Sequence, residues 1–168
     1  MKVQDMMTAA PECCRPEDNL GEAVALLWSA DCGVLPVTDH SGHVAGILTD
    51  RDICIALGTR NQRASEIRVA SVMRTNVHTC QPSEDVLTAL GRMGEWRVRR
   101  LPVVDTIGRL VGILSLNDVV LAAGPGNGVR PGAVLDAFKA VGAHQLPVPT
   151  AVRRPDRQTS EVSHAAVT

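Results

Sequence analysis

The sequence predicts an α/β (α+β) fold of two tandem β-α-β-β-α units, followed by a disordered C-terminal tail. The first observation is a self-match: residues 3–57 align with residues 69–123 without a gap and share about fifteen identities, where chance gives roughly three. The second is that helical and strand spacings follow one another in the same order in both copies. The third is composition, because 45% apolar and 21% charged residues over 168 positions suffice for a packed core.

The first helix of each copy is predicted from apolar residues at helical spacing. In the first copy it begins at Asp18 or Asn19, and in the second it begins near Ser83. One face of each helix is apolar, with Leu20, Ala23, Val24, Leu27 and Trp28 in the first copy and Val86, Leu87, Leu90 and Met93 in the second. These faces are expected to pack on a sheet.

A strand, a glycine turn, a second strand and a closing helix follow in each copy. Gly42 and Gly108 mark the turns, and the continuous apolar strands predict burial on both faces. A short strand before the first helix, around Cys13-Cys14 and from Val77 to Cys80, completes each unit. The other predicted ranges are 34–39, 44–48 and 50–57 in the first copy, and 101–105, 110–114 and 116–123 in the second.

We therefore divide the chain into a first repeat over residues 1–66, a second repeat over 67–123 and a C-terminal region over 124–168. The composition of Gly124 to Gly128 predicts a linker. A short amphipathic helix is expected from Gly132 to Val141, and the residues from Ala143 onward lack periodicity and are expected to be disordered.

Composition and charge exclude several classes of function. A net charge of -1 and only 2% aromatic residues argue against nucleic-acid binding by phosphate contacts or base stacking. No apolar run approaches the roughly 18 residues of a membrane span, and the N-terminus lacks the apolar core of a signal peptide. The five cysteines form no C-x-x-C pair. We expect a cytoplasmic protein with no nucleic-acid or membrane partner.

Neither a metal site nor an enzyme is predicted. The sequence lacks a nucleophile elbow, a Walker-type loop and the H-E-x-x-H motif. His40-Ser41-Gly42-His43 and Cys13-Cys14 do not have the spacing of chelating motifs. One alternative stays open, since Cys14 and Cys80 are equivalent in the two copies and could face each other as a zinc or redox pair.

Two motifs and one basic pair are candidates for ligand binding. Thr49-x-x-Asp52 and Ser115-x-x-Asp118 each link a strand to a helix, where backbone N–H groups favour an anion, although the same spacing is also a helix capping box. Arg99-Arg100 precedes a buried strand and could bind phosphate oxygens, or it could simply be a solvated strand edge. Their first-copy equivalents, Gly33 and Val34, carry no charge, so two unequal clefts are expected.

The duplicated pattern Leu-Pro-Val-x-Asp, then Gly-Ile-Leu-[Thr/Ser]-x-x-Asp, resembles the CBS-domain pair (Bateman module) over about residues 3–123. The chain is similar to stand-alone two-CBS proteins of bacteria, including the hypoxic-response type. The resemblance implies pseudo-twofold packing of the repeats, two clefts between them, and a homodimer. Such clefts bind AMP, ADP, ATP, S-adenosylmethionine or NAD-type ligands, with the Asp on the ribose and the Arg pair on phosphate. By the same analogy Val77 and His78, like Pro11 and Glu12, line cleft walls.

The resulting prediction is a non-catalytic regulatory module without a catalytic cofactor, which binds an adenine nucleotide or S-adenosylmethionine as a regulatory ligand. The predicted ligand-binding residues are Arg99, Arg100, Ser115, Asp118, Val77, His78, Thr49 and Asp52. We expect a phosphorylated ligand beside Asp118, whereas the cleft of Thr49 and Asp52 is empty, weak or occupied by a neutral adenosyl group. The alternative is a ligand-free dimeric stress-associated scaffold that binds an unknown protein through its tail and its closing helices, at Ile53, Ile55, Ala56, Leu57, Val119, Val120 and Ala122.

Overall fold

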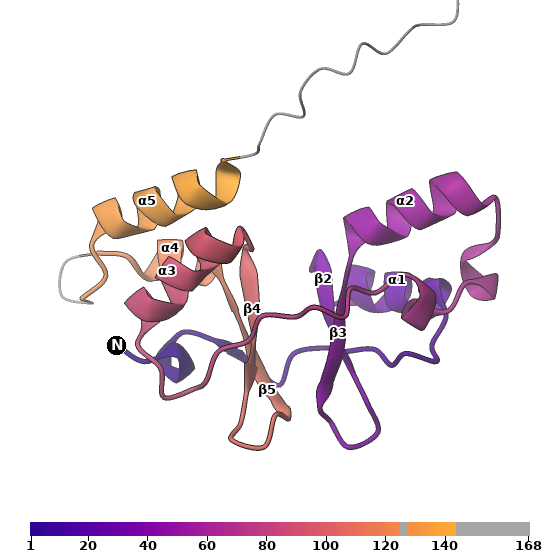
Figure 1. Cartoon of the computed structure of the whole chain (residues 1–168), viewed down its shortest axis with the longest axis horizontal. Helices are drawn as coiled ribbons and strands as arrows, with labels where there is room; N and C mark the ends of the chain where they lie inside the picture. The colour runs from indigo at the N-terminus through magenta and orange to yellow at the C-terminus, as the bar shows by residue number, and fades with distance from the viewer. Residues whose placement is uncertain (125–127, 144–168) are drawn as a thin grey trace, which may run out of the picture.

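Two halves of similar architecture lie side by side, each with a β-hairpin toward the middle of the molecule and helices toward the outside (Figure 1). The structure is a computed structural model that describes residues 1–124 and 128–143. The predicted tail and the middle of the predicted linker lie outside the described residues. The tandem α+β arrangement expected from the sequence is confirmed.

Each half contains an antiparallel hairpin between two helices. The first half has α1 (Leu20–Ser29), β2 (Val34–Thr38), β3 (Val44–Thr49) and α2 (Asp50–Arg60). The second has α3 (Val86–Trp96), β4 (Arg100–Val104), β5 (Leu110–Ser115) and α4 (Leu116–Ala122). Short 3₁₀ turns cover Val3–Asp5, Ala64–Glu66 and Val69–Ser71.

Helix starts follow the capping side chains. The Asn19 side chain accepts a hydrogen bond from the backbone N–H of Glu22, so α1 begins at Leu20 as expected. Asp85 accepts from the backbone N–H of Leu87, and α3 therefore begins at Val86, three residues after the predicted Ser83. The strand expected before each first helix is reduced to a single parallel bridge, Cys14–Val37 in one half and Cys80–Val103 in the other.

The segment that leads into each repeat packs on the other half of the molecule. Residues of β1 (Thr8–Ala9) pair with β5, so the sheet order there is β1-β5-β4. In the same way the backbone of Arg74 pairs with Ile47 on β3. Consequently Val3 is buried in the second core, while Ile67 and Val69 are buried in the first. The division at residue 66 describes the sequence repeat, whereas each packed core includes a segment from the neighbouring repeat.

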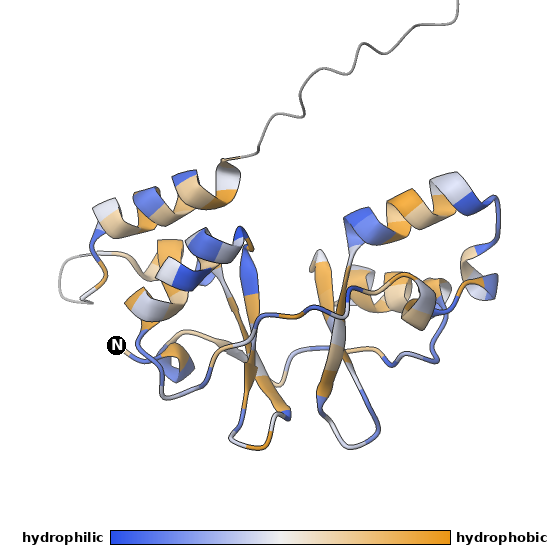
Figure 2. Ribbon diagram, in the orientation of Figure 1, coloured by the Kyte–Doolittle hydropathy of each residue, from blue (hydrophilic) through white to orange (hydrophobic). Residues whose placement is uncertain are grey.

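An additional helix, α5 (Pro131–Gly142), covers only the second half, where the sequence predicted a helix from Gly132 to Val141. It packs on α3 and α4, and Gly94 of α3 allows the close approach because a Cβ there would lie 3.1 Å from the Cβ of Ala140. Figure 2 shows hydrophobic and hydrophilic residues alternating along the helices, as expected when one side of a helix is buried.

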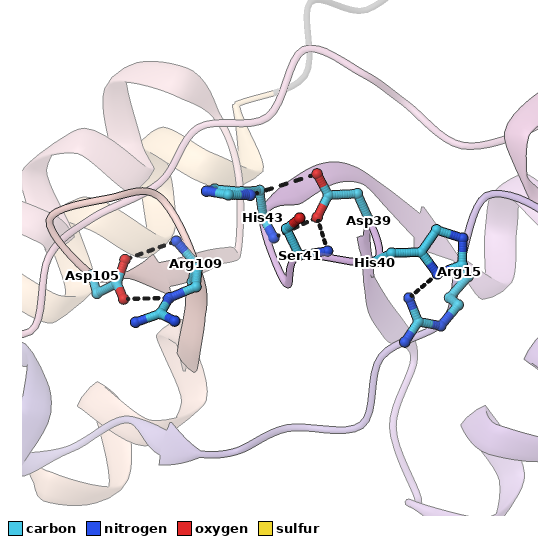
Figure 3. Close-up of polar contacts among 7 residues, drawn as sticks. All are labelled: Arg15, Asp39, His40, Ser41, His43, Asp105 and Arg109. Carbon is cyan, nitrogen blue, oxygen red and sulfur yellow. Dashed lines mark hydrogen bonds and ion pairs between the residues drawn. The ribbon is translucent and has the colours of Figure 1, made fainter.

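The turns of the two hairpins, which lie at the bottom of the view in Figure 1, contact each other (Figure 3). The backbone N–H of Leu110 donates to the carbonyl of Gly42 at 2.9 Å, and both turn glycines have positive φ, +83° at Gly42 and +86° at Gly108. Asp39 and Asp105 accept backbone N–H groups inside their own turns. Backbone hydrogen bonds, first from His43 and from Arg109 respectively, hold the pKa of both carboxyls below its usual range.

Cys14 and Cys80 do not form a shared pair. Each is buried in the core of its own half, and burial raises the pKa of both thiols to about 12. Among the residues that the structure describes, no three His, Cys, Asp or Glu side chains are grouped in a way that could hold a metal ion. No described helix has the length and apolar character needed to cross a bilayer.

Candidate functional site

A cavity of about 290 Å³ lies between the two halves and is lined by both. Its size is close to the lower end of the roughly 300–1,000 Å³ typical of small-molecule sites. We call it the Asp118 cleft, and its lining residues are Thr8, Pro11, Glu12, Ala30, Asp31, Cys32, Val34, Pro36, Arg100, Ile113, Ser115 and Asp118. Three of the predicted binding residues, Arg100, Ser115 and Asp118, are thus brought together.

Asp118 is positioned by the junction of β5 and α4. The Ser115 side chain accepts a hydrogen bond from the backbone N–H of Asp118 at 3.1 Å, and the Asp118 Oδ2 accepts from the backbone N–H of Ser115 at 2.8 Å. The capping box predicted as an alternative is therefore present. Capping uses only Oδ2, and within the described part of the chain Oδ1 of Asp118 has no hydrogen-bond or ion-pair partner, so a ligand could use it.

Arg100 supplies the cation of the cleft. It lies opposite Ser115 in the β4–β5 register, is half-buried, and has no acidic partner among residues 1–124 and 128–143. Arg99, its predicted companion, is exposed and does not line the cavity; its carbonyl accepts the backbone N–H of Leu116 at 2.8 Å. Alternation along the strand separates the two side chains.

The cleft also contains acidic residues that the sequence motifs do not mark. Glu12, which the sequence indicated only as the equivalent of His78, lines the cleft together with Asp31 and Asp118. The cleft therefore contains three carboxylates and one guanidinium, that of Arg100. Asp31 was not predicted, and neither was Thr8, which reaches the cleft because β1 crosses to β5. The gapless alignment held a usable signal for Thr8, since it aligns with Arg74, an unlike residue in a well-matched region.

Thr49 and Asp52 lie at the corresponding position of the other half, which we call the Asp52 site. Asp52 is only 9% exposed, and its Oδ2 accepts the Thr49 hydroxyl at 2.6 Å. Its Oδ1 accepts from Arg74 Nη2 at 2.7 Å and Nε at 3.1 Å. Burial alone would raise the pKa of Asp52, but the hydrogen bonds from Arg74 and Thr49 and the Arg74 charge hold it below the usual range.

Val77 and His78 are half-buried but do not line the Asp118 cleft; their equivalents Pro11 and Glu12 do. The His78 ring instead stacks on Trp96, with ring centroids 4.2 Å apart and planes 10° from parallel. The Arg92 guanidinium lies 5.7 Å from the centre of the same Trp96 ring. An aromatic pair therefore occupies the place that Glu12 and Ala30 have in the other half.

Comparison with known proteins identifies the family. The CBS domain model matches residues 3–59 and 69–124, and the chain belongs to the CBS-domain family as a tandem CBS pair. Inosine-5'-monophosphate dehydrogenase of Mycobacterium leprae is 36% identical over 115 residues, which are 68% of this chain. They are only 21% of the dehydrogenase, so the match spans about a fifth of that enzyme.

Solved CBS pairs share this architecture. Hypoxic Response Protein I, solved with two coordinated zinc ions, is 26% identical with a TM-score of 0.67, over 74% of this chain and 100% of that one. The CBS domain pair of protein MJ0100, in complex with 5'-methylthioadenosine and S-adenosyl-L-methionine, is 27% identical with a TM-score of 0.66, over 72% and 94%. CBSX2 in complex with AMP is 28% identical with a TM-score of 0.64, over 72% and 94%.

Proposed function

We propose that this chain is a non-catalytic regulatory module that binds an adenosine-containing ligand in the Asp118 cleft. The observation that carries the proposal is a cavity lined by both halves, in which Asp118 has an unused carboxylate oxygen and Arg100 an unpaired guanidinium among the described residues. The adenosyl ligands held by the CBS pairs of MJ0100 and CBSX2 support the ligand class.

Each part of the cleft has a role in this proposal. Asp118 accepts hydrogen bonds from the ribose hydroxyls, and the adenine lies against the apolar surface of Val34, Pro36 and Ile113. Arg100 pairs with a phosphate or a carboxylate of the ligand. Three carboxylates and one guanidinium line the cleft, so a highly negative ligand is repelled. AMP, which carries less negative charge than ATP, and S-adenosylmethionine, which carries cationic groups, should therefore bind more tightly than ATP.

Binding would act on the packing of the two halves, since the ligand contacts both of them. A ligand changes a conformational equilibrium only by its different affinity for the two states. One that fits the closed arrangement of the halves therefore favours that arrangement. At about 100 times its dissociation constant it should add roughly 2.7 kcal/mol to the free energy of unfolding.

The test is titration calorimetry together with thermal melting in the presence of AMP, ADP, ATP, S-adenosylmethionine or NADH. We expect Asp118→Asn and Arg100→Met to weaken binding at least tenfold, the effect of losing roughly 1.4 kcal/mol or more of charge-assisted contact. The matched controls are the exposed neighbours Asn117→Ala and Arg99→Met, which should bind as the wild type does. Absence of binding by every compound, or full binding by both cleft variants, contradicts the proposal.

We further propose that the chain is a homodimer, which the groove between α1 and α2 supports. This groove has a volume of about 640 Å³, and Trp28 on its rim is 88% exposed. In the second half the equivalent helices are covered by α5. Sedimentation should show a dimer that Trp28→Asp converts to a monomer. If no adenosyl compound binds while Trp28→Asp abolishes capture of a protein partner, the scaffold alternative replaces the sensor.

A cytoplasmic location is the final part of the proposal. All five cysteines are unpaired thiols in the structure, and Cys14 and Cys80 are buried as small apolar side chains. Thiols in this state fit a reducing compartment.

A further inference from the structure

The two halves carry unlike side chains at one pair of equivalent backbone positions. Thr8 pairs with Ile113 on β5, and Arg74 pairs with Ile47 on β3. The shift in numbering that aligns Leu35 with Leu101 also aligns Thr8 with Arg74 and Ile47 with Ile113. Thr8 and Arg74 therefore have equivalent places in the two halves. Thr8 lines the Asp118 cleft, whereas Arg74 reaches Asp52.

The Arg74 guanidinium binds Oδ1 of Asp52, and the equivalent atom of Asp118 has no partner among the described residues. Both Nη2 and Nε of Arg74 donate to Oδ1 of Asp52, and Oδ2 of the same carboxylate is taken by the Thr49 hydroxyl. Asp118 has no cation partner among the described residues, and its Oδ1 accepts no bond there. A ribose hydroxyl could therefore bond to Asp118 directly, but at Asp52 it would have to displace a charge-assisted pair.

Displacement of that pair would be unfavourable. Asp52 is 9% exposed, so removing its partner leaves a poorly hydrated carboxylate, and a neutral hydroxyl is a weaker partner than a guanidinium. The Arg74 side chain is itself 64% exposed, which keeps the cost of forming the pair low on its side.

We infer that Arg74 acts as an internal substitute for a ligand at the Asp52 site, so that each chain binds one adenosyl ligand, in the Asp118 cleft, instead of two. This inference rests on the proposed function. Residue 74 thereby sets the stoichiometry of binding, and the side chain at residue 8 leaves the other site open.

The experiment exchanges the two residues. Titration calorimetry with AMP and, separately, with S-adenosylmethionine should give one site per wild-type chain for a probe that binds. Arg74→Thr should give two, and Arg74→Thr combined with Asp52→Ala should return to one. Thr8→Arg should abolish the single site, and because Thr8 is exposed, this variant is expected to fold. Arg74→Lys, which retains the charge, should stay at one.

The outcomes separate this inference from the proposed function. Two sites per wild-type chain, or one site in both the wild type and a folded Arg74→Thr variant, overturn the role of Arg74 and leave the sensor function intact. No binding by either the wild type or Arg74→Thr overturns both. Binding by Arg74→Thr alone supports the role of Arg74 and overturns the assignment of the Asp118 cleft. Circular dichroism establishes folding, and carbon NMR of the Asp52 carboxyl should show its pKa rising when Arg74 is removed.

Discussion

The two halves of this protein have nearly the same backbone and different side-chain chemistry at the equivalent positions of Asp52 and Asp118. The hairpin registers correspond pair for pair, from Val34 with Thr49 and Arg100 with Ser115 down to an irregularity at the same point, after Val37 and after Val103. The side chains at the cleft do not correspond, because Asp118 has an unused oxygen and Asp52 is paired with Arg74. A duplication can thus keep a scaffold while a few side chains decide which copy has a carboxylate oxygen left unpaired by the described residues.

The outer faces differ as well. In the second half α5 packs on α3 and α4, and Gly94 makes room for it. Trp28 has the equivalent position on α1, where it is 88% exposed beside an open groove. One half thus covers its helical face with α5, and in the other half the described residues leave the same face open.

The largest predicted effect tests whether the halves unfold together. Leu48 and Leu114 are equivalent, 0% exposed, and each lies in a different core. Replacing either by Ala should lower the free energy of unfolding by about 2–5 kcal/mol. Because Val3 and Val69 each connect one repeat to the core of the other, we expect one shared transition in urea, followed by circular dichroism, for both variants. Two separate transitions would show that the cores are independent.

A smaller effect is expected from exchanging residues on the outer faces. Gly94→Trp places a large side chain where even a Cβ would lie 3.1 Å from the Cβ of Ala140, so α5 must shift. Overpacking of this kind costs about 1–3 kcal/mol. The control Trp28→Ala should change stability of the monomeric chain by no more than about 0.5 kcal/mol, since the side chain is exposed. Equal losses in the two variants, measured by urea unfolding at low protein concentration, would contradict the difference between the faces.

The smallest effect concerns acid stability. Asp52 has a pKa below its usual range in the folded chain, so its contribution to stability is present above the ordinary carboxyl value of about 3.9 and is lost as the pH falls through the lower folded value. Asp52→Asn should therefore flatten the fall of stability at acid pH, and Arg74→Thr should flatten it too, because Arg74 is the partner. The measurement is urea unfolding from pH 7 down to acid pH.

A residual slope should persist in both variants, since hydrogen bonds in the hairpin turns also hold the pKa of Asp39 and Asp105 low. An acid profile identical to that of the wild type in both variants would mean that the Arg74–Asp52 pair adds nothing to stability in solution.

The sequence by itself determined the repeated scaffold and three residues of the candidate site. Local signals were sufficient there: Asn19 and Ser115 cap helices, Gly42 and Gly108 turn the hairpins, and Arg100, Ser115 and Asp118 all lie within one repeat, close to the junction of a strand pair and a helix. Spacing along the chain decides such contacts, because the atoms involved are only a few residues or one hairpin apart.

Only the tertiary structure decided which segment packs against which half, and therefore what else lines the cleft. Thr8 reaches Ile113, and Arg74 reaches Asp52, through a crossing of the leading segments that leaves no mark on local periodicity. Arg99 and Arg100 are adjacent in sequence, yet strand alternation sends only Arg100 into the cavity. Contacts between distant residues depend on how apolar faces are buried across the whole chain, so these pairings become visible only once the two halves are assembled.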